Sequence, residues 1–186
     1  KCTPWWSTRF LNPQLVTSIK RIIIENKFFM EKSYIHIYNK LIELARNKDL
    51  YKDFEKQDVF SDRLTFFLLH FAIFSKVFKN KDNKKILQEI YDFIFRQLEL
   101  SIREIGYGDV SINKKMKDYI NFLHKIIGDI DNWDELSYEN KMVFFSKTLN
   151  QTSNTDFFVD YFDKYLQLLK KNTLNSFINN IIDLKF

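Results

Sequence analysis

Hydrophobic residues recur at helical spacing along most of the chain. From Tyr34 onward, apolar side chains fall at i, i+3, i+4, i+7, i+8 and i+11, which places them on one face of a helix. Similar patterns predict helices over 15–30, 61–78, 84–105, 112–127, 138–149, 156–169 and 174–184. No convincing strand pattern or internal repeat is present. The sequence therefore predicts an all-α fold, a single helical domain of about seven to eight helices.

Polar stretches separate these helices and suggest how the chain is divided. Ser33 is expected to cap the helix of 34–45, and Ser61 or Asp58 the helix that ends at Phe78. "LYKDF" is expected to form a short helical turn, and "DNWDELSYENK" a polar link. "NQTSNT" is the strongest candidate linker. These breaks predict a basic N-terminal segment or helix over 1–30, a helical domain over 31–150, and C-terminal helices over 151–186 that pack on the domain or are appended to it.

Two of the chain's three glycines lie close together in the stretch "REIGYGD". Gly106 directly follows the helix of 84–105, where a glycine can turn the chain into the left-handed region at little cost. Gly108 is expected to allow a second tight bend, and Asp109 or Ser111 to cap the next helix, which stops at Gly128. This pattern predicts a helix-turn-helix whose angle the glycines help to fix.

The same stretch also looks like a potassium-channel filter or a dinucleotide-binding loop, but the surrounding sequence excludes both interpretations. The most apolar run, residues 64–78, would span ~23 Å as a helix, which is too short for a bilayer core of about 30 Å. A dinucleotide loop needs a preceding strand and a third glycine. The apolar run instead predicts a central buried helix. Its phenylalanines are expected to be core residues, with a partner groove as the alternative: Phe66, Phe67, Phe71 and Phe74.

The chain is basic, with a formal net charge of +5 and a sequence pI of about 9.1, which is compatible with nucleic acid, ribosomes or anionic membranes as partners. Lysines cluster in the loop of 76–85 and again at Lys114, Lys115 and Lys117. The second cluster opposes the dipole of its own helix, so either a partner or salt bridges to Glu104 and Asp109 would have to favour it. Cys2 is the only cysteine, which excludes a disulfide within the chain and fits a reducing compartment.

The sequence offers no credible active site. His36, His70 and His124 lie on different predicted helices, and no pair has the spacing of a metal-binding helix. His36 is expected beside the core face, His70 inside the core with hydrogen-bonded nitrogens, and His124 on a helix surface. No nucleophile elbow or phosphate loop occurs. We therefore expect a protein that is not an enzyme and that has no cofactor or metal of its own.

Residues 100–128, "LSIREIGYGDVSINKKMKDYINFLHKIIG", resemble the signature region of the ubiquinol-cytochrome c chaperone family. Residues 33–54 resemble the opening helix of that family, and residues 62–78 its central helix, with Arg63 and the Leu69–His70 pair in place. The resemblance covers roughly residues 31–150. One departure is Ile127-Gly128-Asp129, where the family usually has an aromatic-Gly-Arg triplet. The matching residues of the signature region are Arg103, Glu104, Gly106, Gly108, Asp109, Lys114, Lys115, Met116 and Lys117.

The resemblance implies an assembly chaperone for the cytochrome bc1 complex. It implies newly made cytochrome b as the client, with the ribosome exit region, a small helper subunit and the anionic inner membrane as further partners, and no DNA. It also implies a location at the cytoplasmic face of a bacterial inner membrane, or at the matrix face in a mitochondrion. The expected structural or partner-binding residues are Arg63, His70, Arg103, Glu104, Gly106, Gly108, Asp109, Lys114, Lys115 and Lys117.

Three other functions stay open at this point. A peripheral membrane-binding helical module of another pathway is the main alternative, because Trp5 and Trp6 lie in a basic segment and indoles favour the membrane interface. An enzyme with an unrecognised site would need a deep pocket with convergent polar groups around His70. RNA binding rests on charge alone.

Overall fold

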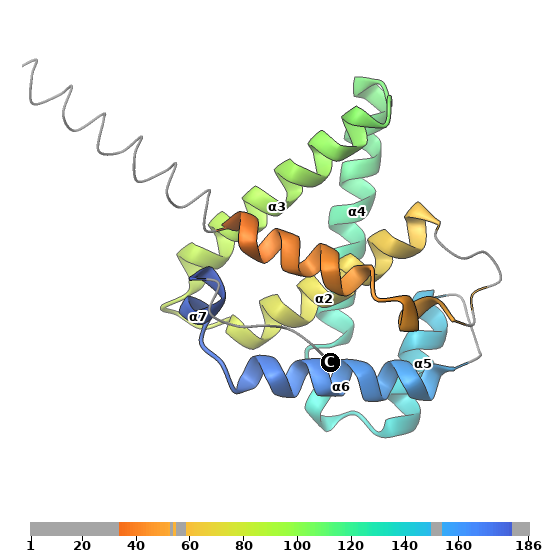
Figure 1. Ribbon diagram of the computed structural model, residues 1–186. Coiled ribbons are helices and arrows are strands. Elements are labelled where there is room, and N and C mark those ends of the chain that lie inside the picture. Colours follow the sequence, from red (N-terminus) through yellow and green to blue (C-terminus); the bar gives the residue numbers. More distant parts are fainter. Residues whose placement is uncertain (1–33, 53, 55–58, 150–153, 180–186) are drawn as a thin grey trace, which may run out of the picture.

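The computed structural model describes residues 34–52, 54, 59–149 and 154–179, and all regular secondary structure in these ranges is helical (Figure 1). This confirms the predicted all-α class and single helical domain. The helix expected over 15–30 and the Ser33 cap lie outside the described residues. The described elements are a helix over 34–45, η1 (Lys48–Tyr51), α2 (Phe60–Phe78), α3 (Lys84–Glu104), α4 (Asp109–Asp129), η2 (Trp133–Glu135), α5 (Tyr138–Leu149), α6 (Thr155–Lys170) and α7 (Leu174–Ile178).

The α2 helix lies at the centre and packs against both α4 and α6. Every residue from Phe66 to Phe74 is buried, as expected of a helix that is apolar all round and surrounded by other helices. Phe66, Phe67, Phe71 and Phe74 are therefore core residues, as expected. Of the four, Phe67 also lines a cavity at the surface, so the alternative of a partner groove stays open for that ring. Around α2, the α3–α4 pair forms a hairpin that projects away from the bundle, and α6 crosses the opposite side (Figure 1).

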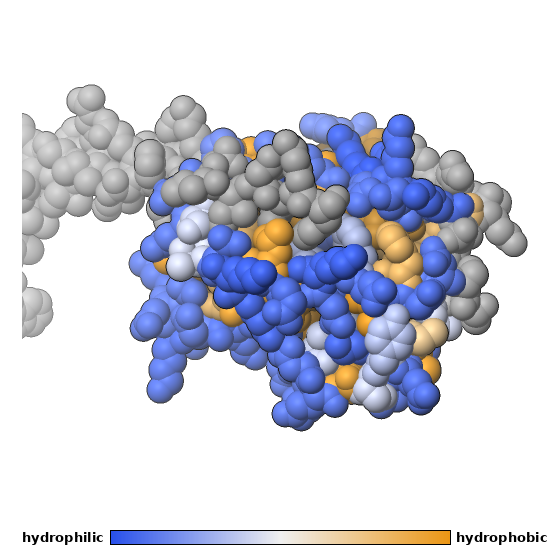
Figure 2. All heavy atoms as spheres, turned by 60° about the horizontal axis from the view of Figure 1, so that its bottom comes forward, coloured by the Kyte–Doolittle hydropathy of each residue, from blue (hydrophilic) through white to orange (hydrophobic). Residues whose placement is uncertain are grey.

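Aromatic rings join α2, α5 and α6 into one core. The rings of Phe145 and Phe162 stack with centroids 5.2 Å apart, and those of Phe66 and Phe158 lie 5.7 Å apart. On the side that Figure 2 brings forward, hydrophilic residues cover most of the surface formed by described residues, and hydrophobic side chains show only in small, separate areas. Most aromatic side chains of the described residues are thus buried in the core.

One core residue comes from a segment predicted to be a polar link. Trp133, in η2, is only 1% exposed, and its indole Nε1 donates a hydrogen bond to Asp163 Oδ1 on α6 at 2.6 Å. The neighbours of Trp133 in sequence are polar, so local pattern gave no sign of this burial.

Several helix ends differ from the prediction. The N-cap of α2 is Val59, and Ser61 lies within the first turn; Asp58 is outside the described residues. The N-cap of α4 is Gly108, so Asp109 and Ser111 are inside the helix and do not cap it. Helix α4 continues one residue past Gly128. Helix α7 ends at Ile178, and the rest of the helix predicted to 184 lies outside the described residues, apart from Asn179, its C-cap.

Candidate functional site

The α3–α4 turn contains the only backbone conformation in the "REIGYGD" stretch that needs a glycine. Gly106 follows the C-cap residue Ile105 with a φ of +97°, and its amide donates to the carbonyl of Arg103 at 2.9 Å. This confirms the role predicted for Gly106. Gly108 has φ −74° and ψ 155°, an extended conformation open to any residue, so the prediction of a second glycine-dependent bend was wrong.

Arg103 ties the two helices of the hairpin together. Its Nη2 donates to Glu99 Oε1 one turn earlier at 2.8 Å, and its Nη1 donates to the carboxylate of Asp109, the first residue of α4. These two carboxylates raise the pKa of Arg103 above its usual value. Asp109 also lies in the first turn of α4, where a negative charge is favourable to the helix dipole. Asp109 is thus the first helical residue of α4 and not its N-cap, and its carboxylate pairs with Arg103.

The lysines of α4 do not form the salt bridges that the sequence suggested. Within the described residues, Glu104 and Asp109 form no ion pair with Lys114, Lys115 or Lys117. Lys114 and Lys117 are exposed, and the Lys115 ammonium lies over the Tyr107 ring, 4.6 Å from its centroid. Binding of a partner by this cluster stays a prediction.

The apex of the hairpin also exposes apolar side chains. Ile105 is 58% exposed, Tyr107 43% and Val110 86%. All three lie at or next to the α3–α4 turn, which projects from the bundle (Figure 1). Sequence reasoning placed these residues in a connection and missed that they would be exposed together.

His70 is a core histidine, as predicted from its place in the apolar run. It is fully buried, and its Nδ1 lies 2.6 Å from the carbonyl oxygen of Phe66, so Nδ1 carries the proton and donates. The other ring nitrogen, Nε2, accepts from the hydroxyl of Tyr161 at 3.0 Å. Burial lowers the pKa of His70 to about 4. Both nitrogens are therefore occupied, which leaves His70 no open position for a substrate or a metal.

The other two histidines lie on the surface. His36 is exposed on the helix of 34–45, so its predicted place beside the core face was wrong. His124 is exposed on α4, as predicted, and its ring is parallel to that of Tyr91 within 10°.

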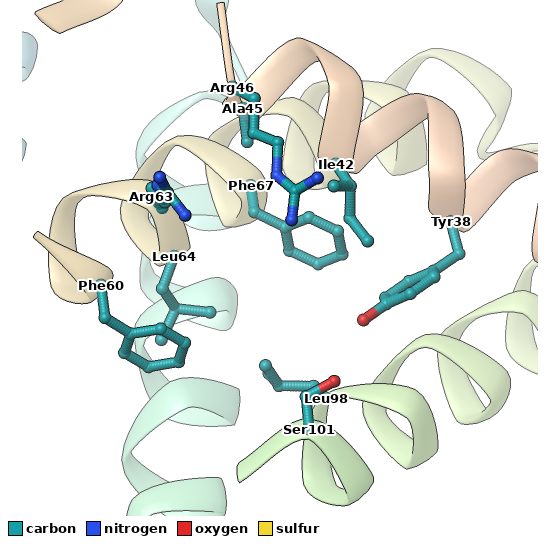
Figure 3. A pocket seen from close by; sticks show the side chains of 10 residues that line it. All are labelled: Tyr38, Ile42, Ala45, Arg46, Phe60, Arg63, Leu64, Phe67, Leu98 and Ser101. Atoms are coloured by element: carbon teal, nitrogen blue, oxygen red, sulfur yellow. The ribbon is translucent and has the colours of Figure 1, made fainter. Parts of the chain in front are cut away.

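An apolar cavity of about 230 Å³ opens between the helix of 34–45, the start of α2 and the second half of α3. In Figure 3, Phe60, Leu64 and Phe67 of α2 face Tyr38 and Leu98 across this space. The guanidinium groups of Arg46 and Arg63 lie along one side of the cavity (Figure 3). Phe60 is 45% exposed, so a large apolar ring remains accessible at the cavity. Such a space suits an apolar side chain that is followed by a carboxylate or a carbonyl-rich turn.

The predicted site residues therefore fall in three places and not in one site. Arg103, Gly106, Gly108 and Asp109 meet in the α3–α4 turn, with Glu104 at the end of α3 and the lysines further along α4. Arg63 lines the cavity, and His70 lies in the core. Sequence reasoning missed Arg46 and Phe60, because their meeting depends on how three helices pack.

The described residues contain no group of three histidine, cysteine, aspartate or glutamate side chains that could hold a metal ion. Within the same ranges, no helix is both long and apolar enough to cross a membrane.

Comparisons with known proteins agree with this architecture. The model of the family described as ubiquinol-cytochrome C chaperone matches residues 52–133. Among solved structures, the chain is similar to the crystal structure of the Cbp3 homolog from Brucella abortus, with a TM-score of 0.71 and 19% sequence identity, over 90% of this chain and 97% of that one. At this identity the likeness shows a shared fold. No curated protein matches the chain.

Proposed function

We propose that this chain is an assembly chaperone for the cytochrome bc1 complex, on the basis of the match between residues 52–133 and the ubiquinol-cytochrome C chaperone family. It acts by binding and not by catalysis, and its client is newly made cytochrome b at the inner membrane. It needs no cofactor. It works on the cytoplasmic face of a bacterial inner membrane, or on the matrix face in a mitochondrion.

The family match is the observation that carries this proposal. The matched residues include the whole of α2, α3 and α4, and with them His70, Arg63 and the α3–α4 turn. The segment that matches the family model therefore contains the central core helix and the projecting hairpin. The fold shared with the Cbp3 homolog supports the proposal over nearly the whole chain.

The apolar cavity is the surface that we propose for the client. A chaperone for a membrane protein has to hold apolar side chains reversibly, and a small cavity with an exposed aromatic ring can do so. Arg46 and Arg63 add positive charge beside the apolar walls, which would favour the point where a client's apolar segment meets an acidic loop. The ribosome exit region and a small helper subunit are further proposed partners.

The direct test is deletion of the gene in its host. Reduced-minus-oxidised spectra of the membranes report b-type haem, and an immunoblot reports cytochrome b. We expect both to fall while the cytochrome b transcript is unchanged, and a plasmid copy of the gene to restore them. Normal cytochrome b and normal bc1 activity in the deletion strain would refute the chaperone role.

A peripheral membrane-binding module of another pathway is the second candidate. Trp5 and Trp6, which first suggested it, lie outside the described residues. The structural feature that supports this membrane-binding function is a hollow lined by lysines at the α2–α3 connection. A chaperone that works at a membrane could use the same hollow.

A further inference from the structure

The α2–α3 connection borders a hollow of about 800 Å³ that is distinct from the apolar cavity. The end of α2, the start of α3 and the second half of α4 line it. Its charged lining consists of four lysines and a single aspartate, so positive charge dominates. These residues are Lys76, Lys79, Lys81, Lys84 and Asp131, and His124 lies beside them.

One of the four lysines holds two elements of the fold together, and the other three are available to bind a ligand. The Lys76 ammonium donates to the carbonyl oxygens of Ile130 and Asp131, which joins α2 to the end of α4, and burial lowers its pKa. Within the described part of the chain, the ammonium groups of Lys79, Lys81 and Lys84 form no ion pair. Their side chains are exposed around the hollow.

The position of these lysines is unfavourable for the helix that carries them. Helix α3 begins with Lys84 and Lys85, its first turn holds no acidic residue, and the side chain of its N-cap Asn83 does not cap it. Positive charge at a helix N-terminus opposes the helix dipole. Asp82 is the one acidic residue of the connection and is exposed beside them. An anionic ligand bound here would neutralise the positive charge of these lysines at the start of α3.

Apolar side chains line part of the hollow, which favours a ligand that has an apolar part as well as a negative charge. Leu87, Tyr91 and Ile127 line it and are only partly buried. The ring of Tyr91 lies parallel to that of His124, with their centroids 6.2 Å apart. Lysines around an apolar floor match a ligand with phosphate groups and an apolar part next to them.

We propose that this hollow is the surface through which the protein contacts phosphate headgroups of an anionic membrane. The choice of a membrane among phosphate-bearing partners rests on the proposed function, in which the client is a membrane protein. Lysines near such a surface contribute about 1 kcal/mol each, or about fivefold in affinity. The three available lysines together are then expected to raise the affinity for an anionic membrane about a hundredfold.

The test uses the purified full chain and vesicles of phosphatidylcholine with and without phosphatidylglycerol, separated by sedimentation. The site variant is K79Q/K81Q/K84Q. The matched control is K147Q/K164Q/K171Q, which removes the same charge from exposed positions on α5 and at α6, away from the hollow. We expect binding only to the anionic vesicles, an affinity about a hundredfold lower for the site variant, and a control variant close to the wild type. Circular dichroism checks that both variants are folded.

Four results would overturn the inference. The first is that the wild type does not bind anionic vesicles, and the second is that the site variant binds them as well as the wild type. The third is an equal loss in the control variant, which would indicate non-specific attraction. The fourth is displacement from vesicles by inorganic phosphate or by single-stranded RNA at matched ionic strength, which would assign the hollow to a soluble phosphate or to nucleic acid. None of these results bears on the deletion phenotype, so the chaperone role can stand if this inference fails.

Discussion

At the scale of single residues, His70 makes the stability of the fold depend on pH. Its folded pKa is about 4, against 6.5 in an unfolded chain. Between these values the unfolded chain binds more protons, so the free energy of unfolding falls as pH falls from about 6.5 to about 4 and loses no more from His70 below that. We expect a contribution of about 2 kcal/mol to be lost between pH 7.5 and pH 5. Urea denaturation at both pH values measures it.

Carboxylates also titrate in acid, so the effect of His70 has to be isolated. His70→Asn removes the titrating ring and keeps a side-chain donor for the carbonyl of Phe66. This variant is expected to be less stable at pH 7.5 but to lose about 2 kcal/mol less than the wild type on going to pH 5. An equal loss in both proteins would mean that the pH dependence has another source.

The two glycines of the α3–α4 turn should respond differently to the same substitution. Gly106→Ala places a side chain at φ +97°, which is expected to cost about 1–2 kcal/mol. Gly108→Ala introduces a methyl group at an extended residue with no atom within 4 Å of it, so its effect is expected to stay within about 0.5 kcal/mol. Thermal or urea unfolding of both variants checks this. Equal costs would show that the left-handed conformation of Gly106 is not what the turn requires.

At the scale of elements, a polar contact fastens η2 to α6. Asp163 accepts from the buried indole of Trp133 and pairs with Lys141 of α5 at 2.9 Å. Asp163→Ala leaves the indole N–H without an acceptor and is expected to cost about 1–3 kcal/mol. Asp163→Asn retains a carbonyl oxygen for the indole and should cost clearly less. Denaturation followed by circular dichroism measures both.

An exposed ion pair nearby provides the control for that prediction. Lys170 of α6 pairs with Asp134 of η2 at 2.9 Å, and both side chains are largely exposed. Asp134→Ala is expected to cost less than about 1 kcal/mol. If it destabilises the protein as much as Asp163→Ala, then charge rather than the buried indole determines how η2 is held.

The elements differ in how far their sequence foretells them. The helices of 34–45, α2 and α3 follow from periodicity, because one face or the whole surface of each is buried. The start of α4 does not follow from the sequence pattern. Asp109 could have capped the helix or paired with the lysines of α4, and in the folded chain it pairs with Arg103. Burial of Trp133 likewise depends on α5 and α6, which lie later in the sequence. Sequence pattern therefore predicts the helices better than their ends and links.

At the scale of the whole molecule, two candidate surfaces lie at opposite ends of α2. Phe60 lines the apolar cavity, and Ser75 lines the basic hollow. The 15 helical steps from Phe60 to Ser75 correspond to roughly 22 Å along the helix axis. Neither surface was visible in the sequence as a site, because each is assembled from three helices. The family signature instead pointed to the α3–α4 turn, the part whose local pattern is most distinctive.

This separation predicts that client handling and membrane contact can be impaired independently. Phe60→Ser removes an exposed ring at the start of α2 and should not greatly affect folding. In the deletion strain, we expect this variant to restore several-fold less cytochrome b than the wild-type gene, while the purified protein binds anionic vesicles normally. Val143→Ser, at a similarly exposed apolar residue on α5, is the control and should restore cytochrome b fully. Full restoration by Phe60→Ser would remove the cavity as the client surface, whereas loss of vesicle binding would show that the two surfaces are not independent.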